Sequence, residues 1–244
     1  MDGDVITLDT DWAPDITIDY TADLLAAAGV KATWFITHDS PATRRLLDSE
    51  WFDIGLHPNF SPSTTQGANP EAVIKHLKAV APNAKLARAH SLALSFRHLE
   101  LMSRFGLESD HSIYLPRASG IQPVLHVCKG GNAPLVRVPY FWEDDYEIMR
   151  PDWPWLPQAD HQGLRVYDFH PIHIYLNTRH IARYETLKTH GPLQAMDESA
   201  LKPHRQEGHG IRTVFEKVIG KLPQIWRMTR VVEYWRRQAT EALG

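Results

Sequence analysis

Short apolar runs alternate with amphipathic segments along the first two thirds of the chain. The runs at residues 4–9, 31–36 and 52–56 are rich in β-branched and aromatic side chains, which is typical of buried strands. Between them, residues 16–29 and 41–49 show the apolar spacing of helices. This rhythm predicts parallel strands joined by crossover helices, as in a barrel or a doubly wound sheet.

The rhythm continues beyond residue 60 in shorter units. A polar loop ends at Asn69, which we expect to cap a helix over 70–80 that begins with Pro70. Residues 143–163 are acidic and rich in Trp and Pro, so we expect an irregular surface loop there. The further elements expected are strands at 85–89, 124–127, 135–141, 164–169 and 224–228, an extended segment at 107–115, and helices at 95–105, 211–219 and 230–243.

Composition narrows the class of protein without identifying it. The 244 residues are 43% hydrophobic and 23% charged, as in ordinary soluble domains, and no linker or repeat divides them, so we predict one domain over 1–244. A formal net charge of −3 argues against nucleic acid or an anionic membrane as partner. We see no signal peptide and no run able to span a bilayer, and we expect a cytoplasmic protein. The single cysteine, Cys128, excludes an intramolecular disulfide and a Cys-rich zinc site.

Carboxylates and histidines fall at the ends of the predicted strands. Asp9 and Asp11 close the first strand, and residues two apart in an extended segment point to the same side. Two such carboxylates repel each other unless a cation or a shared proton intervenes. The other strand-end residues are His57, Arg88, His90 and His170. The ends of parallel strands meet on one face of a barrel, and Asp with His suits zinc, iron, cobalt or manganese. Taken singly, each residue is as well explained by an acidic turn, a loop histidine or a surface arginine.

A series of short motifs resembles the polysaccharide deacetylase family, also known as the NodB homology domain or carbohydrate esterase family 4. The motifs follow the family's order and are Thr7-Leu8-Asp9-Thr10-Asp11, Gly29 to Phe35, Asp53 to His57, Arg88-Ala89-His90-Ser91, Gly106 to Pro116, and Asp168-Phe169-His170-Pro171. The His57-Pro58-Asn59-Phe60 variant is similar to the WbmS-like branch found in bacterial O-antigen gene clusters. The resemblance implies a distorted (β/α) barrel with a divalent metal, commonly zinc.

The resemblance also implies roles for the strand-end residues. Asp11 and His57 would be metal ligands, and the metal would activate water and polarise the acyl oxygen. Asp9 would be the general base, held ionised and oriented by the Arg88 cation. His170 would be the general acid that protonates the departing amine.

The third metal ligand is the point at which this chain departs from the family. The family's second motif is His-x-x-x-His, and Ser61 stands at its second position here. We expect His90 to replace that ligand, with Gln66 and His173 as alternatives. A contact between His90 and the substrate is an almost equal interpretation. The residues that we assign to substrate binding are Trp12, Ser91, His173 and Asp110, whereas His111, His126 and the histidines beyond residue 175 are taken as structural or surface residues.

These observations predict a metal-dependent deacetylase. Its substrate would be an N-acylated sugar or oligosaccharide of bacterial surface-polysaccharide metabolism. The first alternative is a degenerate barrel that binds carbohydrate without chemistry, stacking sugars on Trp142, Trp153 and Trp155. The second is a metal-dependent hydrolase of a small non-sugar amide. The sequence does not specify an oligomeric state.

Overall fold

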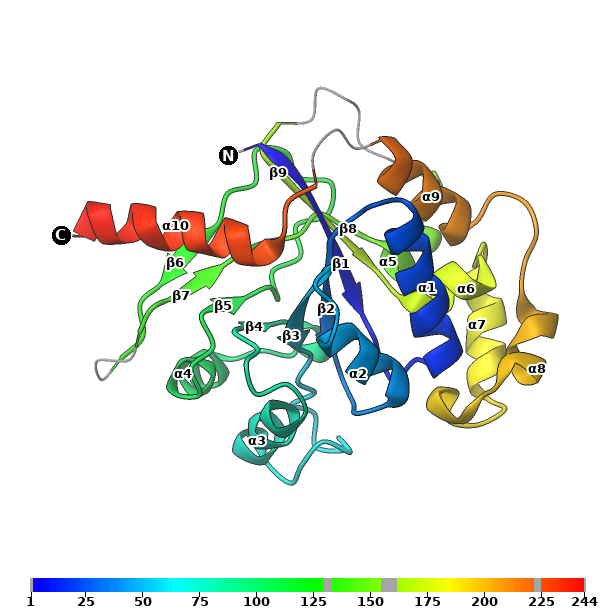
Figure 1. The fold of residues 1–244 in the computed structure, drawn as a ribbon, viewed down its shortest axis with the longest axis horizontal. Helices are drawn as coiled ribbons and strands as arrows, with labels where there is room; N and C mark the ends of the chain where they lie inside the picture. Colours follow the sequence, from blue (N-terminus) through cyan, green and yellow to red (C-terminus); the bar gives the residue numbers. More distant parts are fainter. Residues whose placement is uncertain (1, 130–132, 155–161, 222–224, 244) are drawn as a thin grey trace.

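A curled nine-stranded sheet forms the centre of the computed structural model, which describes residues 2–129, 133–154, 162–221 and 225–243. Its strands are β1 (Gly3–Asp9), β2 (Ala32–Ile36), β3 (Phe52–Leu56), β4 (Leu86–Ala87), β5 (Ser109–Asp110), β6 (Val124–His126), β7 (Leu135–Arg137), β8 (Trp142–Glu143) and β9 (Leu164–Phe169). The spatial order is β6-β7-β5-β4-β3-β2-β1-β9-β8 (Figure 1). Every neighbouring pair is parallel except β6 and β7. Within the described residues the edge strands β6 and β8 do not pair, so the sheet is an open half-barrel. This confirms the expected distorted (β/α) barrel.

Helices cover the outside of this sheet, and one long helix crosses its inner face. They are α1 (Asp15–Ala27), α2 (Pro41–Leu47), α3 (Pro70–Val80), α4 (Phe96–Arg104), α5 (Asp144–Ile148), α6 (Pro171–Leu176), α7 (Ile181–Lys188), α8 (Glu198–Leu201), α9 (Ile211–Lys221) and α10 (Met228–Leu243). Figure 1 shows α1, α6 and α9 together on one side of β1, and α10 lying alone next to β6 and β7. Short 3₁₀ turns lie at His90–Leu92, Leu193–Ala195 and Lys202–His204.

The alternation of side chains along β1 decides which residues face the interior of the half-barrel. Ile6 and Leu8 belong to the apolar cluster that includes α1, whereas Val5 belongs to the cluster that includes Met228 at the start of α10. Successive residues of a strand point to opposite faces, so Asp9 shares the inner side with Val5. The catalytic carboxylate proposed from the sequence is thereby aimed into the half-barrel rather than at the helices.

Several predicted elements agree with the structure. β3 coincides with the strand expected at 52–56, and α3 with the helix expected at 70–80. Asn69 caps α3, because its Oδ1 accepts a hydrogen bond from the backbone N of Ala72 at 2.9 Å. The last strand, expected at 224–228, is wrong in extent: residue 224 lies outside the described residues, Ile225 alone among the rest bridges to β1, and α10 begins at Met228.

The acidic segment at 143–163 is not simply a surface loop. It begins within β8 and continues into α5, where the side chains of Asp144 and Glu147 are fully buried. Burial is tolerated because each carboxylate has a partner, as in the ion pair of 2.6 Å between Glu147 Oε2 and Arg117 Nη2. Residues 155–161, on which part of this prediction falls, lie outside the described residues.

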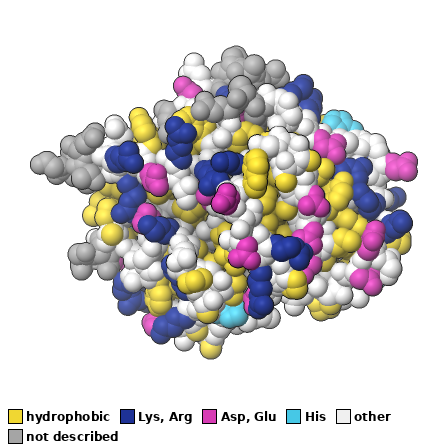
Figure 2. Space-filling model, viewed as in Figure 1, with side chains coloured by type: hydrophobic (Ala, Val, Ile, Leu, Met, Phe, Trp, Pro, Cys, Tyr) yellow, Lys and Arg dark blue, Asp and Glu magenta, His cyan; other side chains and the backbone are white. Residues whose placement is uncertain are grey.

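Charges of both signs are interspersed over the face of the molecule drawn in Figure 2. No large field of one sign is visible there, which accords with the small net charge. None of the helices in the described part of the chain combines the length and hydropathy of a membrane span.

Candidate active site

The candidate site lies where the carboxyl ends of β1, β3, β4 and β9 converge. Asp11 follows β1 in a turn in which Asp11 and Trp12 both have positive φ, 45° and 54°. The backbone N of Trp12 donates a hydrogen bond of 2.9 Å to Thr37 Oγ1, which ties this turn to the end of β2. Consecutive left-handed residues that are not glycine are strained and are found mainly at functional sites.

Three potential metal ligands meet beside this turn. Asp11 Oδ1 lies 2.9 Å from His57 Nε2 and 3.1 Å from His90 Nδ1, and the two histidine nitrogens are 3.3 Å apart. Bond lengths of about 2.0–2.1 Å in a tetrahedral zinc site would place such donors about 3.3 Å apart. Hydrogen bonds cannot satisfy all three contacts together. If both ring nitrogens donate to Asp11 Oδ1, their N–H groups face each other across 3.3 Å, whereas a divalent cation can be bound by all three atoms. The three side chains therefore fit a zinc-like cation.

The alternatives for the third ligand are occupied elsewhere. Gln66 Nε2 donates to the carbonyl oxygens of Thr37 and His57, and Gln66 Oε1 accepts from the backbone N of Asn59. This glutamine holds the loop after β3 rather than offering a free oxygen. His173 Nδ1 is hydrogen-bonded to a threonine hydroxyl at 3.0 Å, and His173 is not among the residues that line the site. The geometry thus favours His90.

Arg88 lies buried behind the metal ligands and faces two carboxylates. Its Nη1 is 2.9 Å from Asp9 Oδ1 and also donates to Asp168 Oδ1. The guanidinium is enclosed by the rings of Phe35 and Tyr140, whose centroids are 4.5 and 4.6 Å away. Arg88 is 1% exposed, so its position, and with it that of Asp9, is fixed by packing as well as by charge.

Asp168 also belongs to this buried group, although its position in the sequence was not predicted to be part of the site. Burial raises its pKa to about 8, although the Arg88 cation opposes the shift, and the Asp9 carboxylate adds to it. The single charge of Arg88 balances only one of the two carboxylates, so a proton on the other would complete the charge balance. A signal was present in the sequence, because Asp168 in β9 lies two residues before His170, which directly follows that strand, and Asp9 and Asp11 show the same spacing at the end of β1.

His170, on the other side of the metal ligands, is held by Asp144. Asp144 Oδ1 lies 2.7 Å from His170 Nδ1, and Asp144 Oδ2 accepts a hydrogen bond of 2.8 Å from the His170 backbone N. Burial alone would lower the pKa of His170, but the charge and hydrogen bond of Asp144 outweigh it, with help from Asp145 and Asp11, and the pKa lies well above its usual value. Asp144 was not predicted as a site residue, because it lies in the acidic segment whose composition is typical of a surface loop.

A cavity of about 480 Å³ opens onto these groups. Trp12 and Ser91, which we assigned to substrate binding, line it, together with Tyr184 from α7. The structure does not bring His173 or Asp110 to this cavity. Asp110 is instead buried in an ion pair of 2.7 Å with a neighbouring arginine, and the His173 ring packs against Tyr184 at 4.5 Å.

The tryptophans proposed as stacking surfaces do not form a platform. Trp142 is fully buried in the core, where its ring packs 4.6 Å from that of Phe169. Trp153 is partly buried and packs against the same apolar cluster. Trp155 lies outside the described residues. The aromatic side chains that do line the cavity are Trp12, Tyr140 and Tyr184.

Comparison with known proteins places these features in a family context. Residues 6–188 match the model of the WbmS-like polysaccharide deacetylases. A crystal structure described as a polysaccharide deacetylase involved in O-antigen biosynthesis, from Bordetella bronchiseptica, is 32% identical, with a TM-score of 0.77 over 89% of this chain and 90% of that one. A polysaccharide deacetylase from Mycobacterium smegmatis shares the fold at 15% identity, with a TM-score of 0.55 over 97% of this chain and 90% of that one. Among curated protein sequences, none matches this chain.

Proposed function

Because the chain belongs to the WbmS-like family of polysaccharide deacetylases, we propose that it hydrolyses an N-acyl group of a sugar in bacterial surface-polysaccharide metabolism with the help of a divalent metal, zinc being the first choice. The observation that carries the proposal is the convergence of Asp11, His57 and His90 between two further groups suited to proton transfer. Asp9 Oδ2 lies 3.5 Å from His57 Nε2, and His170 Nε2 lies 3.6 Å from Asp11 Oδ2.

Asp11, His57 and His90 would hold the metal through one carboxylate oxygen and two imidazole nitrogens. When bound, such an ion lowers the pKa of a coordinated water and polarises the acyl oxygen. The chain contributes rigidity to this arrangement. His57 is 2% exposed, and Gln66 fixes the backbone on its carbonyl side with a hydrogen bond of 3.1 Å. Preorganised ligands of this kind need not be ordered again in each reaction cycle.

Asp9 is the proposed general base. Its Oδ1 is held by Arg88, which leaves Oδ2 facing the metal ligands and free to accept a proton from the attacking water. Arg88 cannot itself give up a proton at physiological pH, so its role is to orient the carboxylate and to stabilise its charge.

His170 is the proposed general acid. Its Nδ1 is hydrogen-bonded to Asp144, which leaves Nε2 pointing toward the cavity as the proton donor. Because the pKa of His170 lies well above its usual value, the ring carries a proton at neutral pH. It can pass that proton to the leaving amine, which would otherwise depart as a strongly basic amide anion.

Acetate release from N-acetylated sugars, with metal content measured in parallel, tests the proposal. The full chain should lose activity with a chelator and regain it with zinc. Asp9→Asn should lower kcat by roughly 10²–10⁴-fold while its metal content stays unchanged. Asp48→Asn, at an exposed carboxylate in the C-cap of α2, is the matched control and should behave as the unmodified chain.

Other outcomes would point to the alternatives. Glycan binding without acetate release, insensitive to chelator and to Asp9→Asn, would indicate a carbohydrate-binding barrel. Turnover confined to small non-sugar amides would indicate the second alternative, a metal-dependent hydrolase of small amides. Acetate release that persists in a metal-free protein would contradict the proposed mechanism directly.

A further inference from the structure

A second group of metal-ligating side chains lies on the side of the sheet opposite to the candidate active site. Glu100 belongs to α4, His126 is the last residue of β6, and Cys128 follows two residues later. His126 pairs with Leu135, the first residue of β7, and β7 is parallel to β5. The group therefore lies near the amino ends of the parallel strands, whereas the candidate active site lies at their carboxyl ends. None of the three side chains is among those that line the active-site cavity.

The three side chains bring potential metal donors close together. Glu100, His126 and Cys128 each offer one donor atom, and these atoms all lie within 4.8 Å of one another. The shortest contact between the charged pair joins His126 Nε2 to Glu100 Oε1 at 3.9 Å. In a tetrahedral zinc site, bonds of about 2.0–2.3 Å would place such atoms about 3.3–3.6 Å apart. A bound cation would therefore draw them together by about 1 Å at most.

The His126 ring carries a buried nitrogen that the described part of the chain leaves without a hydrogen bond. That atom is Nε2, the one that faces Glu100. A separation of 3.9 Å is too long for a hydrogen bond, and a buried polar atom without a partner is unfavourable. Phe96 holds the ring in this position, because its own ring packs edge-on at 5.4 Å. A cation between His126 and Glu100 would supply the missing partner.

The other two side chains are also held in place. Both oxygens of Glu100 accept hydrogen bonds of 3.0 Å from the backbone N of Lys129, the residue after Cys128. Each carboxylate oxygen has a further lone pair, so Glu100 can bind a cation at the same time. Cys128 is 8% exposed and packs within the apolar cluster that includes Leu99 and Met102. The donors are therefore positioned by the fold before a metal binds.

The combination of donors selects a class of metal. A thiolate with an imidazole and a carboxylate suits zinc, iron or cobalt, whereas magnesium and calcium prefer oxygen donors. A redox role for Cys128 is less well supported. The chain has no second cysteine with which to form an intramolecular disulfide. Burial also raises the pKa of the Cys128 thiol, which disfavours the reactive thiolate.

We propose that Glu100, His126 and Cys128 form a second metal site for a zinc-like cation, which ties α4 to the edge of the sheet. β6 has only three residues and, within the described chain, pairs with β7 alone, so it has few other attachments to the sheet. Figure 1 shows α4, β6 and β7 at the end of the sheet away from α1 and α6. A cation that binds only the folded chain would stabilise this end. The inference does not depend on deacetylation.

Cobalt substitution of the full chain tests this site. Cobalt bound by a thiolate shows a charge-transfer absorption in the near ultraviolet, which carboxylate and imidazole ligands do not give. Cys128 is the single cysteine of the chain, so no other site of the protein can produce this band. We expect the band to appear as cobalt is added, with a second equivalent of cobalt bound at the proposed catalytic site.

Variants locate the band and measure the contribution of each ligand. Cys128→Ala should abolish it. His126→Ala and Glu100→Gln should each lower the affinity read from the band by at least about tenfold. Glu100→Gln replaces a side chain that is 18% exposed and keeps an oxygen that can accept the backbone hydrogen bond, so it is the variant least disturbing to the fold. His76→Ala removes an exposed histidine of α3 and is the matched control, which should leave the band unchanged.

Thermal unfolding gives a second measurement that is independent of colour. His90→Ala is the suitable background, because the proposed catalytic ion is weakened in it. Zinc at about one hundred times its dissociation constant should raise Tm in this background by roughly 5 °C. Adding Cys128→Ala should remove the rise.

The possible outcomes are distinguishable. No charge-transfer band at saturating cobalt would overturn the inference. A band whose affinity is the same in His126→Ala and Glu100→Gln would show that the thiol binds cobalt without these partners, and would overturn it as well. A ligand-dependent band in a chain that releases no acetate would support the second metal site and contradict the proposed function. Acetate release that requires metal, in a chain without the band, would do the reverse.

Discussion

Asp144 is hydrogen-bonded to His170 at two points, to the ring Nδ1 at 2.7 Å and to the backbone N at 2.8 Å. One carboxylate thus sets the position, the tautomer and the charge of the proposed general acid. The pairing joins α5 to the end of β9, so α5 belongs to the site although the sequence of its surroundings resembles a surface loop.

Replacing Asp144 with Asn should shift the pH dependence of the reaction. A general acid must be protonated, so activity is lost as the pH rises through the pKa of His170. In Asp144→Asn the largest contribution that raises the pKa of His170 is lost, and only the charges of Asp145 and Asp11 still oppose the lowering effect of burial, so the basic limb of kcat/KM should move to lower pH. Activity at a mildly alkaline pH should therefore be lower in the variant than in the unmodified chain, and a pH profile of kcat/KM measures the difference.

A graded control is available for this variant in Asp145. Its charge also raises the pKa of His170, but among the described residues its carboxylate makes no hydrogen bond to that ring. Asp145→Asn should therefore shift the limb in the same direction by less. A basic limb that stays in place in Asp144→Asn would refute the assignment of His170 as the acid.

His90→Ala should weaken metal binding. Removing even a partner that supports a ligand lowers metal affinity by about 10–100-fold, and the loss of a direct ligand should exceed about 100-fold. Competition with a chromophoric zinc chelator would measure the affinity. His190→Ala removes an exposed histidine away from the site and is the matched control. Unchanged zinc affinity in His90→Ala would show that His90 is not a metal ligand, and Gln66 and His173 would again be the candidates for the third ligand.

Asp168→Asn should change how stability depends on pH. The pKa of Asp168 is raised from 3.8 to about 8, so the native state holds a proton that the unfolded state has lost. Its contribution to stability is fully present below about pH 4 and is lost as the pH rises through about 8. The uncharged variant lacks this loss. Its stability relative to the unmodified chain should therefore increase with pH, by at most about 1.4 kcal/mol per pH unit.

Thermal or urea unfolding between pH 5 and 9 would show this difference. Groups that titrate equally in both proteins change the two free energies of unfolding by the same amount, so the difference between the proteins reports on residue 168. Parallel stability curves would mean that Asp168 is ionised in the native state and that Arg88 fully balances its charge.

Gly55→Ala should destabilise the fold and disturb the proposed base. A Cβ at Gly55 would lie 2.5 Å from Cδ1 of Phe35, a fully buried ring that packs against the Arg88 guanidinium. Overpacking of this kind lowers the free energy of unfolding by about 1–3 kcal/mol. Because Arg88 holds Asp9, kcat should fall as well.

Gly220→Ala is the matched control for this substitution. Gly220 lies in α9, and its added Cβ would meet nothing within 4 Å. Alanine in a helix is favoured over glycine by about 0.5–1 kcal/mol, so this variant should be slightly more stable. Equal effects of the two substitutions on the free energy of unfolding in urea would show that an added Cβ at residue 55 does not clash with Phe35.

The sequence determined the strand ends and most of the chemistry placed there. Short runs with strand periodicity are local features, and parallel strands bring their carboxyl ends to one edge whatever the details of packing. For that reason Asp11, His57 and His90 could be expected together, and the structure places their donor atoms within 3.3 Å of one another. The order of the motifs likewise indicated the family, whereas the single domain and the cytoplasmic location stay predictions.

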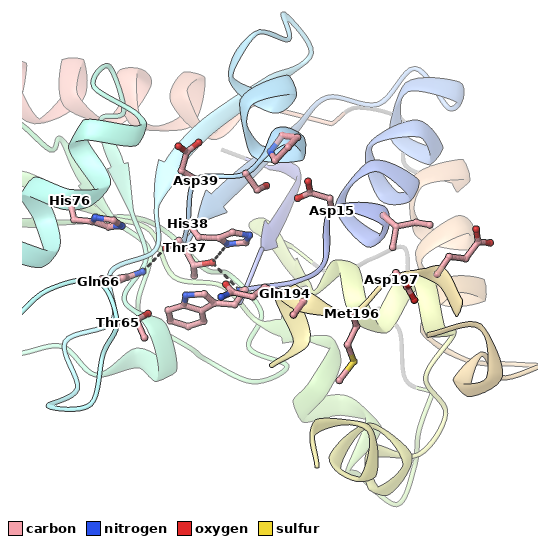
Figure 3. Close-up of a pocket in the computed structure, with 16 residues that line it drawn as sticks. Asp15, Thr37, His38, Asp39, Thr65, Gln66, His76, Gln194, Met196 and Asp197 are labelled. Carbon is pink, nitrogen blue, oxygen red and sulfur yellow. Dashed lines mark hydrogen bonds between the residues drawn. The ribbon is translucent and has the colours of Figure 1, made fainter. Parts of the chain in front are cut away.

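Only the tertiary structure decided which acidic residues are buried partners and which are solvated. Asp144 meets His170 across 26 residues of chain, and Arg88 meets Asp168 across 80. Local composition cannot reveal such pairs, because an acidic segment is tolerated in the core only when a distant base or donor is delivered to it. The cavity of about 920 Å³ drawn in Figure 3 has the same origin, since its walls come from residues near 12, 38, 66 and 195 that no sequence period connects.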